Sequence, residues 1–124
     1  MDDLLGAVGV LTLAHEDTRR RIEEYNGSDF SVQLFEIYTE IPLGNHYHKR
    51  KTETFIILVG GGRLLLQHMS GGVVEEKRLA RGDVIRMSPL VAHTFFLTPG
   101  SQMVCYSSVP FDPNDMDMHP HPLT

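Results

Sequence analysis

GNHYHKRKTETFIILVG, residues 44–60, is the stretch that decides the fold of this 124-residue chain. Side chains two residues apart on a strand share a face, so His46 and His48 point one way and Tyr47 points the other. A short polar segment follows, and Glu53 then opens an apolar run in which its carboxylate can join the two imidazoles. The stretch therefore predicts a β-hairpin that carries three metal-donor side chains on its inner face.

A second stretch, GDVIRMSPLVAHTF (residues 82–95), supplies a further donor. Gly-Asp and Ser-Pro mark two turns, and the strand after the second turn starts at His93, with Phe95 and Leu97 on the same face. Three imidazoles and one carboxylate leave open positions on a divalent ion such as Zn(II), Fe(II), Mn(II), Ni(II) or Co(II), which suits catalysis. We therefore expect one divalent metal ion bound by His46, His48, Glu53 and His93.

From about residue 30 onward, short apolar runs alternate with turn residues. β-branched and aromatic residues dominate the runs, while Gly and Pro supply the backbone angles of tight turns. This pattern is typical of an antiparallel sandwich or barrel, and about eight strands are enough to close a small barrel. We predict strands at residues 31–40, 45–49, 53–59, 63–68, 73–79, 83–87, 93–98 and 102–109.

The length and composition fit a single domain. We expect residues 1–29 to form an N-terminal segment that packs on the barrel or on a dimer partner. Residues 30–110 then form the barrel, and 111–124 form an extended, proline-interrupted C-terminal tail. Within the N-terminal segment, we expect residues 15–25 to form one helical turn followed by a strand, with a short charged helix as the alternative.

The charge and composition restrict the partners of the chain. A net charge of -5 argues against nucleic acid, and we interpret the basic runs 19–21 and 49–51 as solvated faces. No apolar run approaches the ~20 residues that cross a bilayer, so we expect no membrane partner. The apolar stretch 4–13 lacks the basic region of a secretory signal, and a cytoplasmic location is expected.

Three further features have ordinary structural interpretations. We interpret Cys105, the single cysteine, as a core residue. His119 and His121 alternate with prolines, which favours a loosely packed terminus over a metal-binding tail. Small open barrels pair through edge strands, so we expect a homodimer.

The two stretches together resemble the paired motifs of the cupin superfamily. In the first motif, H-x-H is followed after three or four residues by Glu and after six more by Gly; the residues in register are His46, His48, Glu53 and Gly60. Gly82 and His93 are in register with the second motif. The resemblance implies an all-β, cupin-type double-stranded β-helix (jelly-roll) barrel in which the two histidines of the first motif, its Glu and His93 bind the metal. Ser88 and Leu90 stand where the family usually has Pro and Gly, and Leu97 where it often has Asn.

A narrower resemblance concerns the string GNHYHKRKTE, the segment His15-Glu16-Asp17 and the phrase Phe111-Asp112-Pro113. These are similar to the cupin domains of capsular-polysaccharide sugar-nucleotide reductase/epimerases and related sugar isomerases. The resemblance implies epimerase or isomerase chemistry on a nucleotide-linked keto-sugar, with the metal polarising the carbonyl as a Lewis acid. Such chemistry also needs a base, for which the candidates are Tyr38, Tyr47, His68 and Tyr106.

Two alternatives use the same donor set. Fe(II) bound by these residues would suit a dioxygenase, which would depend on oxygen. A barrel of this kind could instead capture a small-molecule ligand without converting it, because one fold hosts many functions.

Overall fold

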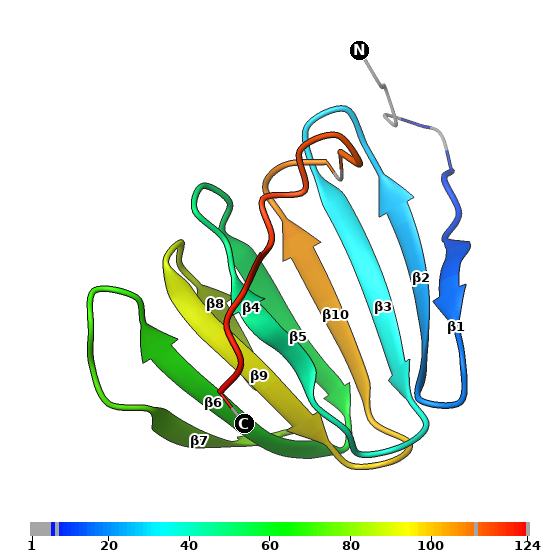
Figure 1. Ribbon diagram of the computed structural model, residues 1–124. Coiled ribbons are helices and arrows are strands. Elements are labelled where there is room, and N and C mark those ends of the chain that lie inside the picture. Colours follow the sequence, from blue (N-terminus) through cyan, green and yellow to red (C-terminus); the bar gives the residue numbers. More distant parts are fainter. Residues whose placement is uncertain (1–5, 7, 111, 124) are drawn as a thin grey trace.

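Two antiparallel sheets face each other in the computed structural model, which describes residues 6, 8–110 and 112–123 (Figure 1). The strand order is β1-β2-β3-β10-β5-β8 in one sheet and β11-β4-β9-β6-β7 in the other. The strands are β1 (Thr12–Glu16), β2 (Arg20–Asn26), β3 (Ser31–Ile37), β4 (Leu43–Tyr47), β5 (Glu53–Val59), β6 (Gly61–His68), β7 (Glu75–Ala80), β8 (Val84–Met87), β9 (Val91–Leu97), β10 (Gln102–Ser107) and β11 (His119–Pro120). The predicted all-β, jelly-roll fold is confirmed.

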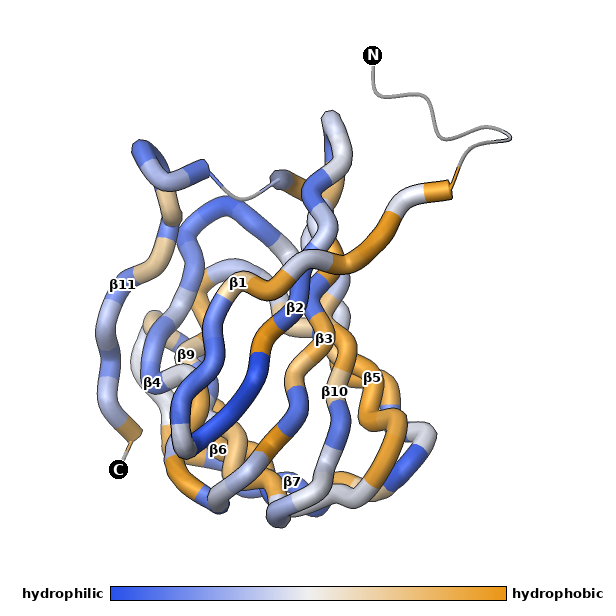
Figure 2. The backbone as a smooth tube through the Cα atoms, turned by 90° about the vertical axis from the view of Figure 1, so that its right-hand side faces the viewer, coloured by the Kyte–Doolittle hydropathy of each residue, from blue (hydrophilic) through white to orange (hydrophobic). Residues whose placement is uncertain are grey.

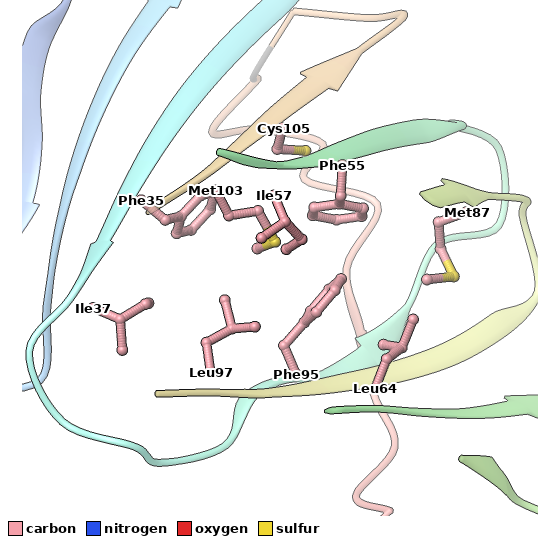
Figure 3. Packing of buried hydrophobic residues seen from close by; sticks show 10 residues of the cluster. All are labelled: Phe35, Ile37, Phe55, Ile57, Leu64, Met87, Phe95, Leu97, Met103 and Cys105. Atoms are coloured by element: carbon pink, nitrogen blue, oxygen red, sulfur yellow. The ribbon is translucent and has the colours of Figure 1, made fainter. Parts of the chain in front are cut away.

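The core lies between the inner faces of the two sheets, and Figure 3 shows its side chains pointing toward one another. Its members are Phe35, Ile37, Phe55, Ile57, Leu64, Met87, Phe95, Leu97, Met103 and Cys105. On β5 the buried Phe55 follows Glu53 on the same face, and on β9 the buried Phe95 follows His93. Because each inner face changes from polar to apolar along its strand, the metal donors lie at one end of a hydrophobic interior.

The loop after β4 crosses between the sheets, which corrects the predicted hairpin. β4 pairs with β9 and β11, whereas β5 pairs with β10 and β8 in the opposite sheet. The residues that were expected to share one hairpin therefore approach the interior from both sheets. Short sequence spacing shows that two strands are neighbours along the chain, but it does not show that they pair.

The N-terminal segment forms a hairpin, β1–β2, at the edge of the six-stranded sheet. The helical turn predicted within residues 15–25 is wrong, because β1 and a bend stabilised by Asp17 occupy its place. The Asp17 carboxylate accepts hydrogen bonds from the backbone N–H groups of Arg19 and Arg20. β1 is exposed at every residue, so it lacks the apolar alternation that would have signalled a strand.

The C-terminal tail runs along β4, and Figure 2 shows the two segments side by side. Residues His119 and Pro120 form the short strand β11 opposite Tyr47 and His46. The His119 ring packs on Tyr47 with centroids 5.2 Å apart, and His121 Nε2 lies 2.9 Å from Gln67 Oε1. The prediction of a loosely packed terminus was therefore wrong for both histidines, because each contacts a residue far away in sequence.

Some predictions lie beyond what the structure describes. Residues 1–5, 7 and Phe111, which belong to the predicted N-terminal segment and the tail phrase, are outside the described residues. Within the described part, no helix is long and apolar enough to cross a membrane. The cytoplasmic location and the homodimer stay predictions.

Leu90 has a left-handed backbone conformation, with φ of 65°, at the position where the cupin motif usually has Gly. The left-handed conformation costs a residue with a Cβ about 1–2 kcal/mol. Glycine avoids this cost, but part of the gain is offset because glycine gives up more backbone freedom on folding. Leu90→Gly is therefore expected to raise the free energy of unfolding by up to about 1 kcal/mol in urea denaturation. Leu58→Gly, at a similarly exposed position within β5, is the control and should lower it; equal destabilisation by both would contradict the account.

Candidate metal centre

Four donor side chains converge at one end of the interior. His46 lies on β4, and His48 is the first residue after that strand. Glu53 begins β5, and His93 lies on β9. Their ligand atoms all lie within 4.8 Å of one another, and the group could hold a metal ion. Donors at about 2.1 Å from a common ion are about 3–4 Å apart, so only a small contraction would bring these atoms to coordination distance.

A bulge in β4 brings His46 opposite His93. The register of the β4–β9 ladder shifts between Gly44 and His46, and Asn45 between them is left-handed with φ of 57°. The Asn45 N–H donates to Thr94 Oγ1 at 3.1 Å, which holds the bulge. A Cβ on Gly44 would lie 2.6 Å from the His93 carbonyl oxygen, so only glycine permits this close approach.

Backbone carbonyls fix the orientation of all three imidazoles. The Nδ1 atoms of His46 and His93 lie 3.1 Å from the carbonyl oxygens of Gly44 and Val91, respectively. His48 Nδ1 lies 2.6 Å from the carbonyl oxygen of Asp117. A carbonyl oxygen only accepts hydrogen bonds, so each Nδ1 carries a proton and each Nε2 is the ring nitrogen left for a metal.

The site favours neutral imidazoles and an ionised carboxylate. Burial, together with His93 and His48, lowers the pKa of His46 to about 4. Burial also lowers the pKa of His93. Burial alone would raise the pKa of Glu53, but His48, Lys51 and His93 outweigh it and lower that pKa to about 2. At neutral pH, His46 and His93 offer lone pairs and Glu53 offers a negative charge, which are the protonation states that metal binding requires.

One pair of atoms in the site tests the fit of a metal directly. His48 Nε2 and Glu53 Oε1 are buried 2.8 Å apart, yet within the described part of the chain neither has a hydrogen-bond partner. Both atoms, an imidazole nitrogen and a carboxylate oxygen, are of the kinds that bind divalent metals in proteins. Buried polar atoms without partners are costly, and a cation between these two atoms satisfies both. The donor set therefore fits a divalent metal ion.

Cys105 and Lys51 contact the second carboxylate oxygen of Glu53. The Cys105 thiol donates to Oε2 at 3.4 Å, and Lys51 Nζ lies 4.0 Å from the same oxygen. Burial raises the pKa of the thiol, so the thiol stays protonated and remains a donor. The interpretation of Cys105 as a core residue is confirmed by its burial, and the thiol additionally orients Glu53.

Asp117 connects the C-terminal tail to the donor loop. The carbonyl oxygen of Asp117 orients His48. Its carboxylate accepts hydrogen bonds from the backbone N–H groups of the three residues that follow His48, which are Lys49, Arg50 and Lys51. These backbone hydrogen bonds lower the pKa of Asp117 against burial, which would raise it.

Asp117→Ala should loosen this loop. We expect metal affinity to fall about 10- to 100-fold, as outer-shell substitutions do, in a competition titration against a chelating dye. Asp115→Ala, which removes a neighbouring exposed carboxylate of the tail, is the control. Unchanged affinity in Asp117→Ala would show that the Asp117 carboxylate does not help to position the donors.

The donors face a cavity of about 310 Å³ between the sheets. Beyond the four donors, its polar side chains are Arg20, Gln33 and Lys51; apolar side chains and Gly44 form the rest of the wall. Sequence reasoning missed Arg20 and Lys51, because it interpreted both basic runs as solvated faces. Arg20 and Ile22 share the inner face of β2, so strand alternation identifies Arg20 only once β2 is known to be a strand.

The four candidate bases all lie elsewhere in the structure. Tyr38 is exposed and donates to Glu16 Oε2 at 2.7 Å, and Tyr106 stacks on Phe30 with ring centroids 6.0 Å apart. Tyr47 faces the C-terminal tail, and the His68 ring lies 2.7 Å from the Ser70 hydroxyl at the end of β6. None of these side chains lines the cavity that contains the donors.

Fold comparisons define the class of the protein. The capsular polysaccharide assembling protein CapF from Staphylococcus aureus superimposes with a TM-score of 0.78 at 20% identity, over 94% of this chain and 33% of CapF. An oxalate decarboxylase from Bacillus subtilis gives 0.73 at 12% identity, over 88% and 30% of the two chains. The protein has a cupin fold, and it corresponds to about a third of the length of these neighbours.

A family model identifies the protein more narrowly. The model of the polysaccharide biosynthesis C-terminal domain matches residues 15–119, so the chain belongs to that family. None of the curated protein sequences matches the chain. The matched range begins within β1 and ends at β11, so it contains both sheets, all four donors and Asp117.

Proposed function

We propose that the protein is a metal-dependent enzyme that acts on a small polar metabolite, with epimerase or isomerase chemistry on a nucleotide-linked keto-sugar as the specific reaction. The observation that carries this proposal is the unpartnered pair His48 Nε2 and Glu53 Oε1, which lies within a four-donor cluster that opens into a cavity. Membership of a polysaccharide biosynthesis family and the fold shared with a capsular polysaccharide assembling protein favour a sugar substrate.

A divalent ion in this site supplies a Lewis acid that polarises a carbonyl oxygen. The carbon beside that carbonyl then lies against apolar walls, which include Phe55 and Phe95 and limit its contact with water. Backbone carbonyls and the Cys105 thiol hold the donor side chains in fixed orientations, so little reorganisation accompanies the reaction.

Lys51 is the residue to which we assign proton transfer. Of the described residues that line the cavity, only Lys51 and Arg20 have titratable side chains outside the donor cluster, and a guanidinium does not deprotonate in proteins. Lys51 is largely buried, and its Nζ lies 4.0 Å from Glu53 Oε2. A group that transfers a proton must reach the reacting atom, and Nζ is the atom that lies beside the donors.

Deuterium exchange tests this proposal without requiring the product to be known. A nucleotide-linked 4-keto-sugar is incubated in D₂O with zinc-loaded, manganese-loaded and chelator-stripped protein, and NMR follows the proton on the carbon beside the carbonyl. We expect exchange with at least one loaded form and none with the stripped form or with His46→Ala. Exchange that survives metal removal would overturn the proposal, and substrate consumption that requires oxygen would favour the dioxygenase alternative.

A further inference from the structure

Arg20 differs from the two arginines beside it. Arg19 pairs with Asp17 at 2.7 Å and Arg21 with Glu16 at 3.2 Å, and neither arginine lines the donor cavity. Arg20 instead lines the donor cavity, and its Nε is buried without a hydrogen-bond partner among the described residues. A buried guanidinium N–H without an acceptor is costly, so this atom requires a partner that the described residues do not supply.

The charges lining the cavity indicate the nature of that partner. Glu53 is the only acidic residue among the described side chains of the wall, and it faces the cluster of imidazoles and Lys51. A divalent ion in the site neutralises Glu53 and leaves the cavity positively charged. A concave site with low-dielectric walls and one sign of charge attracts ligands of the opposite sign.

We propose that Arg20 binds an oxyanion group of the ligand, such as the phosphate of a sugar phosphate, while the other end of the ligand reaches the donor cluster. This inference rests on the proposed function in one respect only, namely that ligand and metal share one cavity. A guanidinium presents a planar fork of N–H donors that matches phosphate and carboxylate oxygens. Arg20 lines the cavity from β2 of the six-stranded sheet, whereas His46 and His93 lie on the opposite sheet.

The size of the cavity restricts which part of the ligand enters. A volume of about 310 Å³ is at the lower end of the range of small-molecule sites, enough for a metabolite and too small for a complete nucleotide-linked sugar. The sugar and the adjoining phosphate therefore occupy the cavity in this assignment, and a nucleoside extends outside it.

Calorimetry on the full, metal-loaded chain tests the assignment with glucose 1-phosphate, its neutral counterpart methyl glucoside, inorganic phosphate and acetate. Arg20→Gln should weaken glucose 1-phosphate binding about 10- to 100-fold, the effect of losing hydrogen bonds to a charged group, and should leave methyl glucoside binding unchanged. Arg21→Gln is the matched control, because it removes the same charge from the opposite face of the same strand and should change binding less than twofold. A stronger response to phosphate or to acetate identifies which oxyanion Arg20 prefers.

Two results would overturn the inference. One is equal binding of glucose 1-phosphate by Arg20→Gln and the wild type, and the other is equal weakening by Arg20→Gln and Arg21→Gln, which would indicate a diffuse charge effect. If Arg20→Gln fails to fold, the wild type decides, because tighter binding of methyl glucoside than of glucose 1-phosphate contradicts an oxyanion subsite. Arg20-dependent phosphate binding without any deuterium exchange would uphold the inference while the proposed reaction fails.

Discussion

Glu53→Gln is expected to lower the affinity for a divalent metal more than about 100-fold, because the loss of an outer-shell partner alone costs 10- to 100-fold. The variant keeps the shape of the side chain and removes its charge. It also removes the unsatisfied carboxylate oxygen that lies 2.8 Å from His48 Nε2, so the metal-free protein should not become less stable. The measurement is a chelator-competition titration, combined with thermal melting of the metal-free protein.

The combination of the two readouts separates ligand loss from misfolding. Glu75→Gln, which removes an exposed carboxylate on β7, is the control and should leave both values unchanged. Metal binding to Glu53→Gln at wild-type affinity would exclude this carboxylate as a ligand. Loss of metal together with a strongly lowered melting temperature would mean that Glu53 supports the fold rather than the ion.

Lys51→Met is expected to reduce turnover of a keto-sugar substrate about 100- to 10,000-fold, the range for removal of a general acid or base. Metal content and melting temperature should stay at wild-type values, because Met replaces the long apolar stem of Lys51 and all four donor side chains remain. Steady-state kinetics in parallel with metal analysis is the measurement.

Lys49→Met provides the control for Lys51, since it removes the same charge from the same loop at an exposed position outside the cavity. Its turnover should remain within about twofold of the wild type, an effect typical of a surface charge. Equal loss of turnover in both lysine variants, or none in Lys51→Met, would contradict the assignment of proton transfer to Nζ.

The donor cluster could be predicted from the sequence because its signal is local. His46 and His48 are two residues apart, so strand geometry alone puts them on one face, and the same alternation places Phe95 behind His93. Sheet membership is not local, and the hairpin prediction for residues 44–60 was wrong for this reason. The pairing of β4 with β9 depends on residues about fifty positions away along the chain.

The residues around the donors could not be predicted, because long-range contacts define their roles. Asp117 reaches His48 from the tail, and Cys105 reaches Glu53 from β10. Arg20 stands in a run of three arginines, of which only the middle one faces the cavity. Which of the three arginines points inward can be deduced only once β2 is known to be a strand, because side chains on a strand alternate between its two faces. The tyrosines and His68 were proposed as bases by residue type alone, and type does not determine which face a side chain occupies.

Elemental analysis of the protein as isolated, purified without nickel, tests the central claim most directly. The account predicts about one divalent ion per chain in the wild type and none above background when His46 and His48 are both replaced by Ala. A wild-type protein without metal, which also fails to take up zinc, iron or manganese on titration, would contradict it.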